Sequence, residues 1–193
     1  GNLTINAQVI TVTGNFNDGT KNRLSILFTS TKKDATRKGG DLNITTRELY
    51  MSDGGKFQIE AGKGQGGDIN INTSILQLEK ATIGVSKKLG EGSAGYIKII
   101  ADSIHLNNES KIDADTESTE IPPDIEEKHT SIDITSKYLI MRDGSQIEAN
   151  ERAGKGTVTT VSGGNVDIDT DVLVALDNSD ITGNSDNFRG CNV

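Results

Sequence analysis

Aromatic residues are scarce in this chain. Only 4% of its 193 residues are Phe, Trp or Tyr, and Trp is absent. Apolar residues of all kinds make up 33% of the sequence. A spherical core filled by bulky side chains is therefore disfavoured, whereas a repeat protein that stacks small aliphatic side chains on copies of themselves is favoured.

Cysteine and proline are also rare. Cys191 is the only cysteine, which excludes an internal disulfide, so we expect packing alone to stabilise the fold.

No apolar run approaches the roughly 20 residues of a membrane-spanning helix, and we expect no membrane insertion. The chain begins at Gly1 without Met or a leader, from which we expect a processed protein or an excised segment with its export signal upstream.

The two halves of the sequence differ in the sign of their net charge. Residues 1–90 carry 12 Lys and Arg against 8 Asp and Glu, a net charge of +4, whereas residues 91–193 carry 8 against 20, a net charge of −12. A chain with an overall charge of −8 is not expected to bind nucleic acid. Opposite charges on the two halves favour end-to-end self-association at low salt, although scattered surface charge gives the same numbers.

A short motif recurs through the whole chain. The stretch GGDLNITTRELYM spans residues 39–51, and GGDINI returns at residues 66–71. Six copies share a pair of apolar residues separated by one polar residue, which predicts a strand with alternate side chains facing a core. These pairs are Leu3/Ile5, Leu42/Ile44, Ile69/Ile71, Ile97/Ile99, Ile132/Ile134 and Val166/Ile168.

Two further apolar columns follow each pair and predict a second short strand. The first column, five residues later, is Ile10, Leu49, Leu76, Ile104, Leu139 and Leu173. The second is Val12, Met51, Leu78, Leu106, Met141 and Ala175. A third strand is predicted, less regularly, around Phe28, Ile59, Ile83, Ile112, Ile147 and Ile181.

Three short strands per copy, with turns at Gly, Asn and Asp between them, predict a triangular coil. Successive copies begin at residues 3, 42, 69, 97, 132 and 166, which gives steps of 39, 27, 28, 35 and 34 residues. We therefore expect an all-β fold, a right-handed parallel β-helix of about six triangular coils. Residues 1–193 are expected to form one domain, an open-ended segment of a longer array.

Insertions gather at one corner of the coil, where loops that carry binding specificity would project. The longest predicted loop, residues 115–130, contains both prolines and is rich in carboxylates, which indicates either a solvated loop or a site for a partner or calcium. Its candidate residues are Asp115, Glu117, Glu120, Asp124, Glu126 and Glu127. A candidate basic patch in the first coil consists of Lys21, Arg23, Lys32, Lys33, Arg37 and Lys38.

One set of carboxylates has a spacing that suits a metal ion. Asp167, Asp169 and Asp171 alternate along the last coil, so they would face one outward side and could hold calcium. Polar residues on the outer side of any strand have the same spacing. We therefore expect no cofactor, with calcium as the alternative.

Catalytic residues are not evident. The outward position between the paired apolar residues varies, as Thr4, Asn43, Asn70, Lys98, Asp133 and Asp167. His105 is expected to face solvent, and His129 lies in the acidic loop. Because polysaccharide lyases and glycosidases use parallel β-helices, a carbohydrate-active enzyme with a site at residues 87–92 or 115–130 stays open as the alternative. A Thr and Ser column interrupted by Ala101 disfavours ice binding.

The repeat resembles that of a known family. The consensus GG-x-apolar-x-Ile, Leu-x-Leu/Met, Gly-x-x-Ile-x-Ala resembles filamentous-haemagglutinin-like exoproteins of two-partner secretion systems, particularly cyanobacterial ones. The best matches are residues 39–55 and 138–149, and residues 177–193 are similar to an element that opens later coils. No Asn-Pro motif of the secretion domain occurs, and Cys191 stands where Gly is usual.

That resemblance implies a secreted, surface-associated β-helix with an adhesive or matrix role. We therefore expect a non-enzymatic structural or adhesive segment at the outer surface of a bacterial cell. Its expected partners are surface glycans or other cell-surface proteins, reached through the corner loops. A subunit of a head-to-tail stacked fibre is a further alternative.

Overall fold

The computed structural model describes residues 1–14, 16–17, 22–23, 25–32, 34, 36–87, 93–118, 130–153 and 164–186. These residues form strands and no helix, which confirms the all-β prediction. The first parallel sheet has the order β1-β5-β7-β9-β11-β13, and the second has the order β14-β12-β10-β8-β6-β4. A short antiparallel pair, β2 (Phe16–Asn17) and β3 (Asn22–Arg23), lies between β1 and β4 in the sequence.

The bounds of the strands follow the motif. The first sheet contains β1 (Leu3–Thr13), β5 (Leu42–Ser52), β7 (Ile69–Glu79), β9 (Tyr96–Asn107), β11 (Ser131–Met141) and β13 (Asn165–Ala175). The second sheet contains β4 (Ile26–Ser30), β6 (Lys56–Ala61), β8 (Thr82–Lys87), β10 (Lys111–Ser118), β12 (Gln146–Ala153) and β14 (Asp180–Asp186). Each strand of the first sheet is followed by one of the second, and we call such a pair a repeat.

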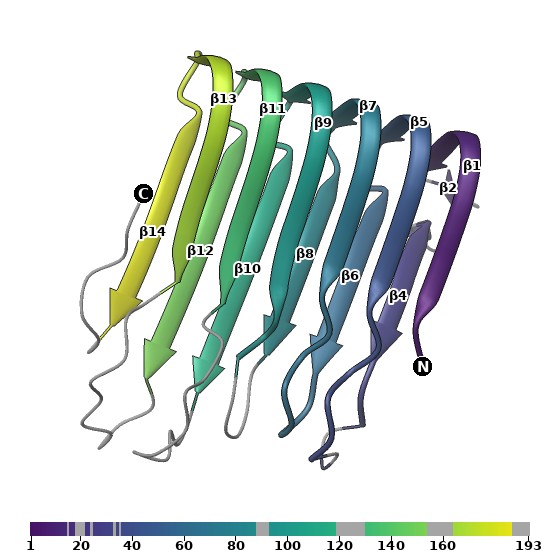
Figure 1. The fold of residues 1–193 in the computed structure, drawn as a ribbon, viewed down its shortest axis with the longest axis vertical. Coiled ribbons are helices and arrows are strands. Elements are labelled where there is room, and N and C mark those ends of the chain that lie inside the picture. The colour runs from purple at the N-terminus through teal and green to yellow at the C-terminus, as the bar shows by residue number, and fades with distance from the viewer. Residues whose placement is uncertain are drawn as a thin grey trace.

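Neighbouring repeats pair at equivalent motif positions. Figure 1 shows the first-sheet strands side by side from β1 to β13, with the second-sheet strands running in the opposite direction behind them. The first predicted column is hydrogen-bonded in register through all six strands: Leu3, Leu42, Ile69, Ile97, Ile132 and Val166. Two in-register parallel sheets are consistent with a parallel β-helix or solenoid.

Both sheets contribute to one core of mostly aliphatic side chains. In the first sheet, the column after the apolar pair is fully buried in the middle repeats, at Leu49, Leu76, Ile104 and Leu139. Its last member, Leu173, is 49% exposed, because β13 is the outermost strand of its sheet. The predicted core positions of the first sheet are therefore confirmed in the four middle repeats, whereas Leu173 and Ala175 of the last strand are exposed.

The first two predicted strands are one strand with a corner inside it. In β5, the inward positions pass from Thr46 to Leu49, so the alternation shifts by one residue at Arg47 and Glu48. The Thr46 hydroxyl donates to the Glu48 carbonyl over 3.0 Å, which satisfies a backbone group at the bend. The Thr and Ser column of the sequence thus lies at a buried corner and is not an exposed face.

The predicted third column is wrong in its first two repeats. Phe57, not Ile59, pairs with Ile83, and Leu27 precedes Phe57 in that column. Phe28 points outward and is 46% exposed. The error arises because Phe57 and Ile59 are both buried, inward residues of β6, so the apolar pattern does not show which of them continues the column.

The turns between the sheets use residues that tolerate a positive φ. Asp53 and Gly54 have φ values of 53° and 87°, and Asp143 and Gly144 have values of 54° and 70°. Asn, Asp and Gly adopt this left-handed region at the lowest cost. The prediction of turns at these residue types is confirmed, although Lys80 and Glu109 also have a positive φ in the turns before β8 and β10.

Candidate functional site

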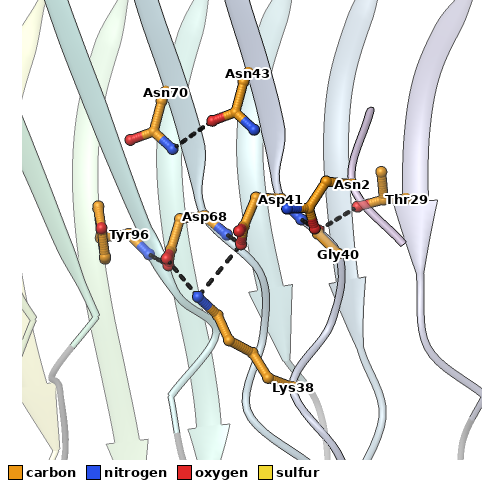
Figure 2. A network of polar contacts seen from close by, with 9 residues as sticks. All are labelled: Asn2, Thr29, Lys38, Gly40, Asp41, Asn43, Asp68, Asn70 and Tyr96. Carbon is orange, nitrogen blue, oxygen red and sulfur yellow. Dashed lines mark hydrogen bonds and ion pairs between the residues drawn. The ribbon is translucent and has the colours of Figure 1, made fainter. Parts of the chain in front are cut away.

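A ladder of hydrogen bonds links the N-terminal ends of β1, β5, β7 and β9 in the first sheet (Figure 2). The Asp41 amide donates to Asn2 Oδ1 over 3.0 Å, and the Asp68 amide donates to Asp41 Oδ1 over 3.0 Å. The Tyr96 amide donates to Asp68 Oδ1 over 3.2 Å. Each side chain binds the equivalent residue of the next repeat, so the ladder fixes the register directly before the strands begin.

A lysine clamps this ladder. Lys38 Nζ lies 2.8 Å from Asp68 Oδ2 and 3.3 Å from Asp41 Oδ1. The hydrogen bond to the Asp68 carboxylate is the main reason that the pKa of Lys38 is raised. Asp68 is buried, and a buried carboxylate requires a compensating charge. Lys38, which precedes β5, provides that charge. Lys38 therefore stabilises the corner and is not a free cation for a ligand.

Beyond the ladder, the outer face of the first sheet has a shallow depression of about 160 Å³. Its lining comes from three neighbouring strands, β5, β7 and β9, and consists of Asn43, Ile44, Thr45, Asn70, Ile71, Asn72, Lys98 and Ile100. The side chains of Ile44 and Ile71 point into the core, so their backbone forms the floor. Outward side chains of the same strands form the walls.

Two amide side chains in the depression hold each other in place. Asn70 Nδ2 donates to Asn43 Oδ1 over 3.0 Å (Figure 2). An amide has two donor hydrogens and an acceptor oxygen, so this bond leaves both Asn43 hydrogens and the Asn70 oxygen for a ligand. Lys98 is the only titratable residue of the lining. The depression can therefore hold a ligand by hydrogen bonds, and its lining offers no acid–base pair.

The candidate basic patch is only partly described. Lys32 and Arg37 are exposed, and Lys38 belongs to the clamp. Lys21 and Lys33 lie outside the described residues, as does the side chain of Arg23. The patch thus keeps two exposed cations in the described part of the chain.

The candidate acidic loop begins later than predicted. β10 extends to Ser118, so Asp115 and Glu117 belong to a strand of the second sheet. Glu120, Asp124, Glu126 and Glu127 lie outside the described residues. One oxygen of Asp115 is buried without a hydrogen-bond partner in the described structure.

Asp113, which the sequence did not single out, has a strongly raised pKa. Burial raises its pKa to about 6, with the charges of Asp115 and Glu148 adding to the shift and those of Lys111 and Lys56 opposing it. Its carboxylate covers the neighbouring Gly84, where a Cβ would lie 2.9 Å from Asp113 Oδ1. The sequence did contain one sign of this contact: Gly84 occupies an outward position of a strand, and a Gly there often marks the close approach of another group.

We expect Asp113→Asn to flatten the pH dependence of stability. The Asp113 pKa is about 6 in the folded state and 3.8 in its unperturbed state. The folded state therefore binds the proton more tightly, and the resulting stability is present at low pH and lost as the pH rises through about 6. The loss is at most about 3 kcal/mol. Urea unfolding between about pH 4 and 7 should show a smaller decline for the variant, and parallel profiles of parent and variant would contradict this origin.

The candidate metal residues do not come together. Asp167, Asp169 and Asp171 are exposed along β13, with Asp171 at the bend of the strand. Within the described ranges, no three or more His, Cys, Asp or Glu side chains form a group that could hold a metal ion. Calcium binding at β13 thus has no geometric support.

His105 has a partner that the sequence did not suggest. His105 Nε2 lies 2.8 Å from Ser103 Oγ, because residues two apart on one strand share a face. The pair lies on the outer side of β9, and neither residue lines the depression. No carboxylate is hydrogen-bonded to this His among the contacts of the described residues.

Comparison with known proteins identifies no relative of this chain. The chain matches no protein-family model, no curated protein and no solved structure. Among the described residues, no helix is long and apolar enough to cross a membrane. The function must therefore be inferred from the two sheets and from the depression on the first of them.

Proposed function

We propose that this chain is a non-enzymatic structural and adhesive segment of a secreted or cell-surface bacterial exoprotein. The observation that carries the proposal is the stack itself, in which equivalent positions pair through six strands of each sheet around one aliphatic core. A stack of this kind is rigid and presents its outer faces repeatedly along its length. The resemblance to filamentous-haemagglutinin-like repeats adds the adhesive role.

The proposed architecture is a right-handed parallel β-helix of triangular coils. The phase shift within β5 and its counterparts supports two sides of the triangle, and the second sheet supports the third. Parallel strands joined by crossover connections are right-handed in nearly all proteins, which supports the handedness.

The proposed partners are surface glycans or proteins at the cell exterior. An open depression lined by amides suits weak, repeated contacts better than it suits catalysis, because acceleration of a reaction requires acid, base or charged groups around the reacting atoms. Many weak contacts along a rigid segment add up through multivalency.

Measuring both the binding of the chain to polysaccharides and its cleavage of them distinguishes an adhesive function from a catalytic one. We expect the purified chain to be retarded in native gels that contain one or more polysaccharides of a neutral and acidic panel, without release of reducing or unsaturated ends. Release above the buffer control would favour the carbohydrate-active enzyme. The absence of retention throughout the panel, together with no binding to bacterial cells, would overturn the adhesive role.

The head-to-tail fibre is a variant that rests on the opposite net charges of the two halves of the sequence. Attraction between such halves is screened by salt. Sedimentation velocity at low and high salt should therefore show association that grows with concentration only at low salt. A monomer under both conditions would exclude the fibre and leave the adhesive segment.

A further inference from the structure

We infer that the depression across β5, β7 and β9 is a binding site for a neutral glycan chain. The glycan would lie across the strands, with its hydroxyl groups on Asn43 and Asn70 and one ring face on Ile100. This inference rests on the proposed adhesive function and names the ligand class and the residues that bind it.

The hydrogen-bonding groups of the depression match vicinal hydroxyls. An amide both donates and accepts, so one Asn can bind two neighbouring hydroxyls of a sugar ring. Because Asn70 already donates to Asn43, both side chains are held in place before a ligand arrives. Held side chains lose less conformational entropy on binding than free ones. Thr45 and Asn72 form a second polar column beside the first.

The spacing of the strands favours a chain over a single small molecule. Neighbouring strands lie about 4.8 Å apart, close to the length of one ring in an extended glycan. Successive rings would therefore meet equivalent positions, with Asn43 and Asn70 on the first two strands and Lys98 on the third. Ile100 on β9 is 42% exposed and can pack against the apolar C–H face of a ring.

The surrounding charges favour a neutral ligand. Lys98 supplies one positive charge, but its partners in register on the next two strands are Asp133 and Asp167. A polymer with regularly spaced carboxylates or sulfates would meet the exposed carboxylate of Asp167 as it continued along the column. Like charges at such distances are repulsive, so an acidic glycan is disfavoured at this face.

The ladder of hydrogen bonds positions the site. Asp41 and Asp68 lie two residues before Asn43 and Asn70, and each binds the backbone of the next repeat. The Lys38 clamp on both carboxylates holds this corner together. The outward amides therefore project from backbone whose register is fixed on one side by the ladder and along the strands by sheet hydrogen bonds.

The test compares two Asn variants of the full chain. In Asn70→Ala, the amide donor of the Asn70–Asn43 bond is removed from the depression. The matched control is Asn184→Ala on the second sheet, where Asn184 Nδ2 donates to Asn150 Oδ1 over 2.9 Å. Titrations would use hexasaccharides of β-1,4-linked glucose, xylose and mannose, with polygalacturonate and heparin as acidic probes. Thermal melts of both variants check that they fold.

We expect at least one neutral hexasaccharide to bind, and Asn70→Ala to weaken that binding about tenfold or more, as loss of about 1.4 kcal/mol implies. Asn184→Ala should bind within about twofold of the parent. Equal binding by the parent and folded Asn70→Ala, or binding of acidic probes alone, would overturn this inference and leave the adhesive function standing. Failure to bind any glycan, together with no retention on polysaccharides or cells, would overturn both.

Discussion

Ile99→Ala is expected to lower the free energy of unfolding by about 2–5 kcal/mol. Ile99 is fully buried in β9 and pairs with Ile71 on one side and Ile134 on the other. Removal of its outer carbons leaves a cavity in the middle of the stack, where neighbouring repeats cannot close in without losing register. Ile71→Ala should have an effect of the same size. Chemical unfolding followed by circular dichroism measures both.

The control for this prediction is the next residue of the same strand. Ile100 is also an isoleucine of β9, but it faces outward and is 42% exposed. Ile100→Ala should therefore change the free energy of unfolding by about 0.5 kcal/mol or less. Equal effects at the two positions, or a variant Ile99→Ala as stable as the parent, would mean that β9 does not present alternate side chains to a stacked core.

Gly67→Ala is expected to destabilise the fold by about 3 kcal/mol or more. A Cβ on Gly67 would lie 2.1 Å from the Gly40 carbonyl oxygen of the preceding repeat. On its neighbour Gly66, a Cβ would lie 1.6 Å from the Ala94 carbonyl oxygen of the following repeat. The two glycines of the motif are therefore required because backbone packs directly on backbone at this corner. Thermal and urea unfolding of the variant test the prediction.

Gly144→Ala is the control for Gly67→Ala, because it introduces backbone strain without a close contact. Gly144 has a φ of +70°, but its nearest neighbour to a new Cβ, Glu109 Cγ, is 3.8 Å away. The substitution should cost only the left-handed strain of about 1–2 kcal/mol. If Gly67→Ala were no more harmful than Gly144→Ala, the close approach of neighbouring repeats at the motif glycines would be wrong.

The sequence predicted the first sheet well because its signal is repeated six times. Leu42, Ile69 and Ile97 alternate with polar residues in the same way, and no other element competes for them. Their exact register was predictable because each inward position recurs at a fixed distance within the repeat. Repetition thus replaces the alignment of relatives that usually identifies a core.

The second sheet was less predictable because β6 has two neighbouring inward positions that are both apolar. Phe57 and Ile59 both face the core, and only the register with β8 shows that Phe57 is the residue that pairs with Ile83. The corner inside β5 was predicted as a break between strands, whereas a side-chain hydrogen bond from Thr46 lets the strand continue through the bend. The apolar spacing of five residues marks the corner, but it does not show whether the strand is interrupted there.

The candidate site could be predicted only in part. Outward positions at Asn43, Asn70 and Lys98 follow from alternation, but their varied identities gave no sign of a common depression. The Asn70–Asn43 bond depends on which residues stand in register, and that is known only once neighbouring repeats are paired. Lys38 appeared to be part of a basic patch because its partner Asp68 lies 30 residues further on.

Distances between spin labels test the in-register stack most directly. Three double variants would be made in a Cys191→Ser background. Each carries Thr4→Cys together with Lys98→Cys, Asp133→Cys or Asp167→Cys, and both cysteines are spin-labelled. All four positions belong to one outward column of the first sheet. At about 4.8 Å per strand, the backbone separations should be about 14, 19 and 24 Å, so the label distances should rise by nearly equal steps. Distances that fail to increase from Lys98 to Asp167 would contradict the stacking of the repeats.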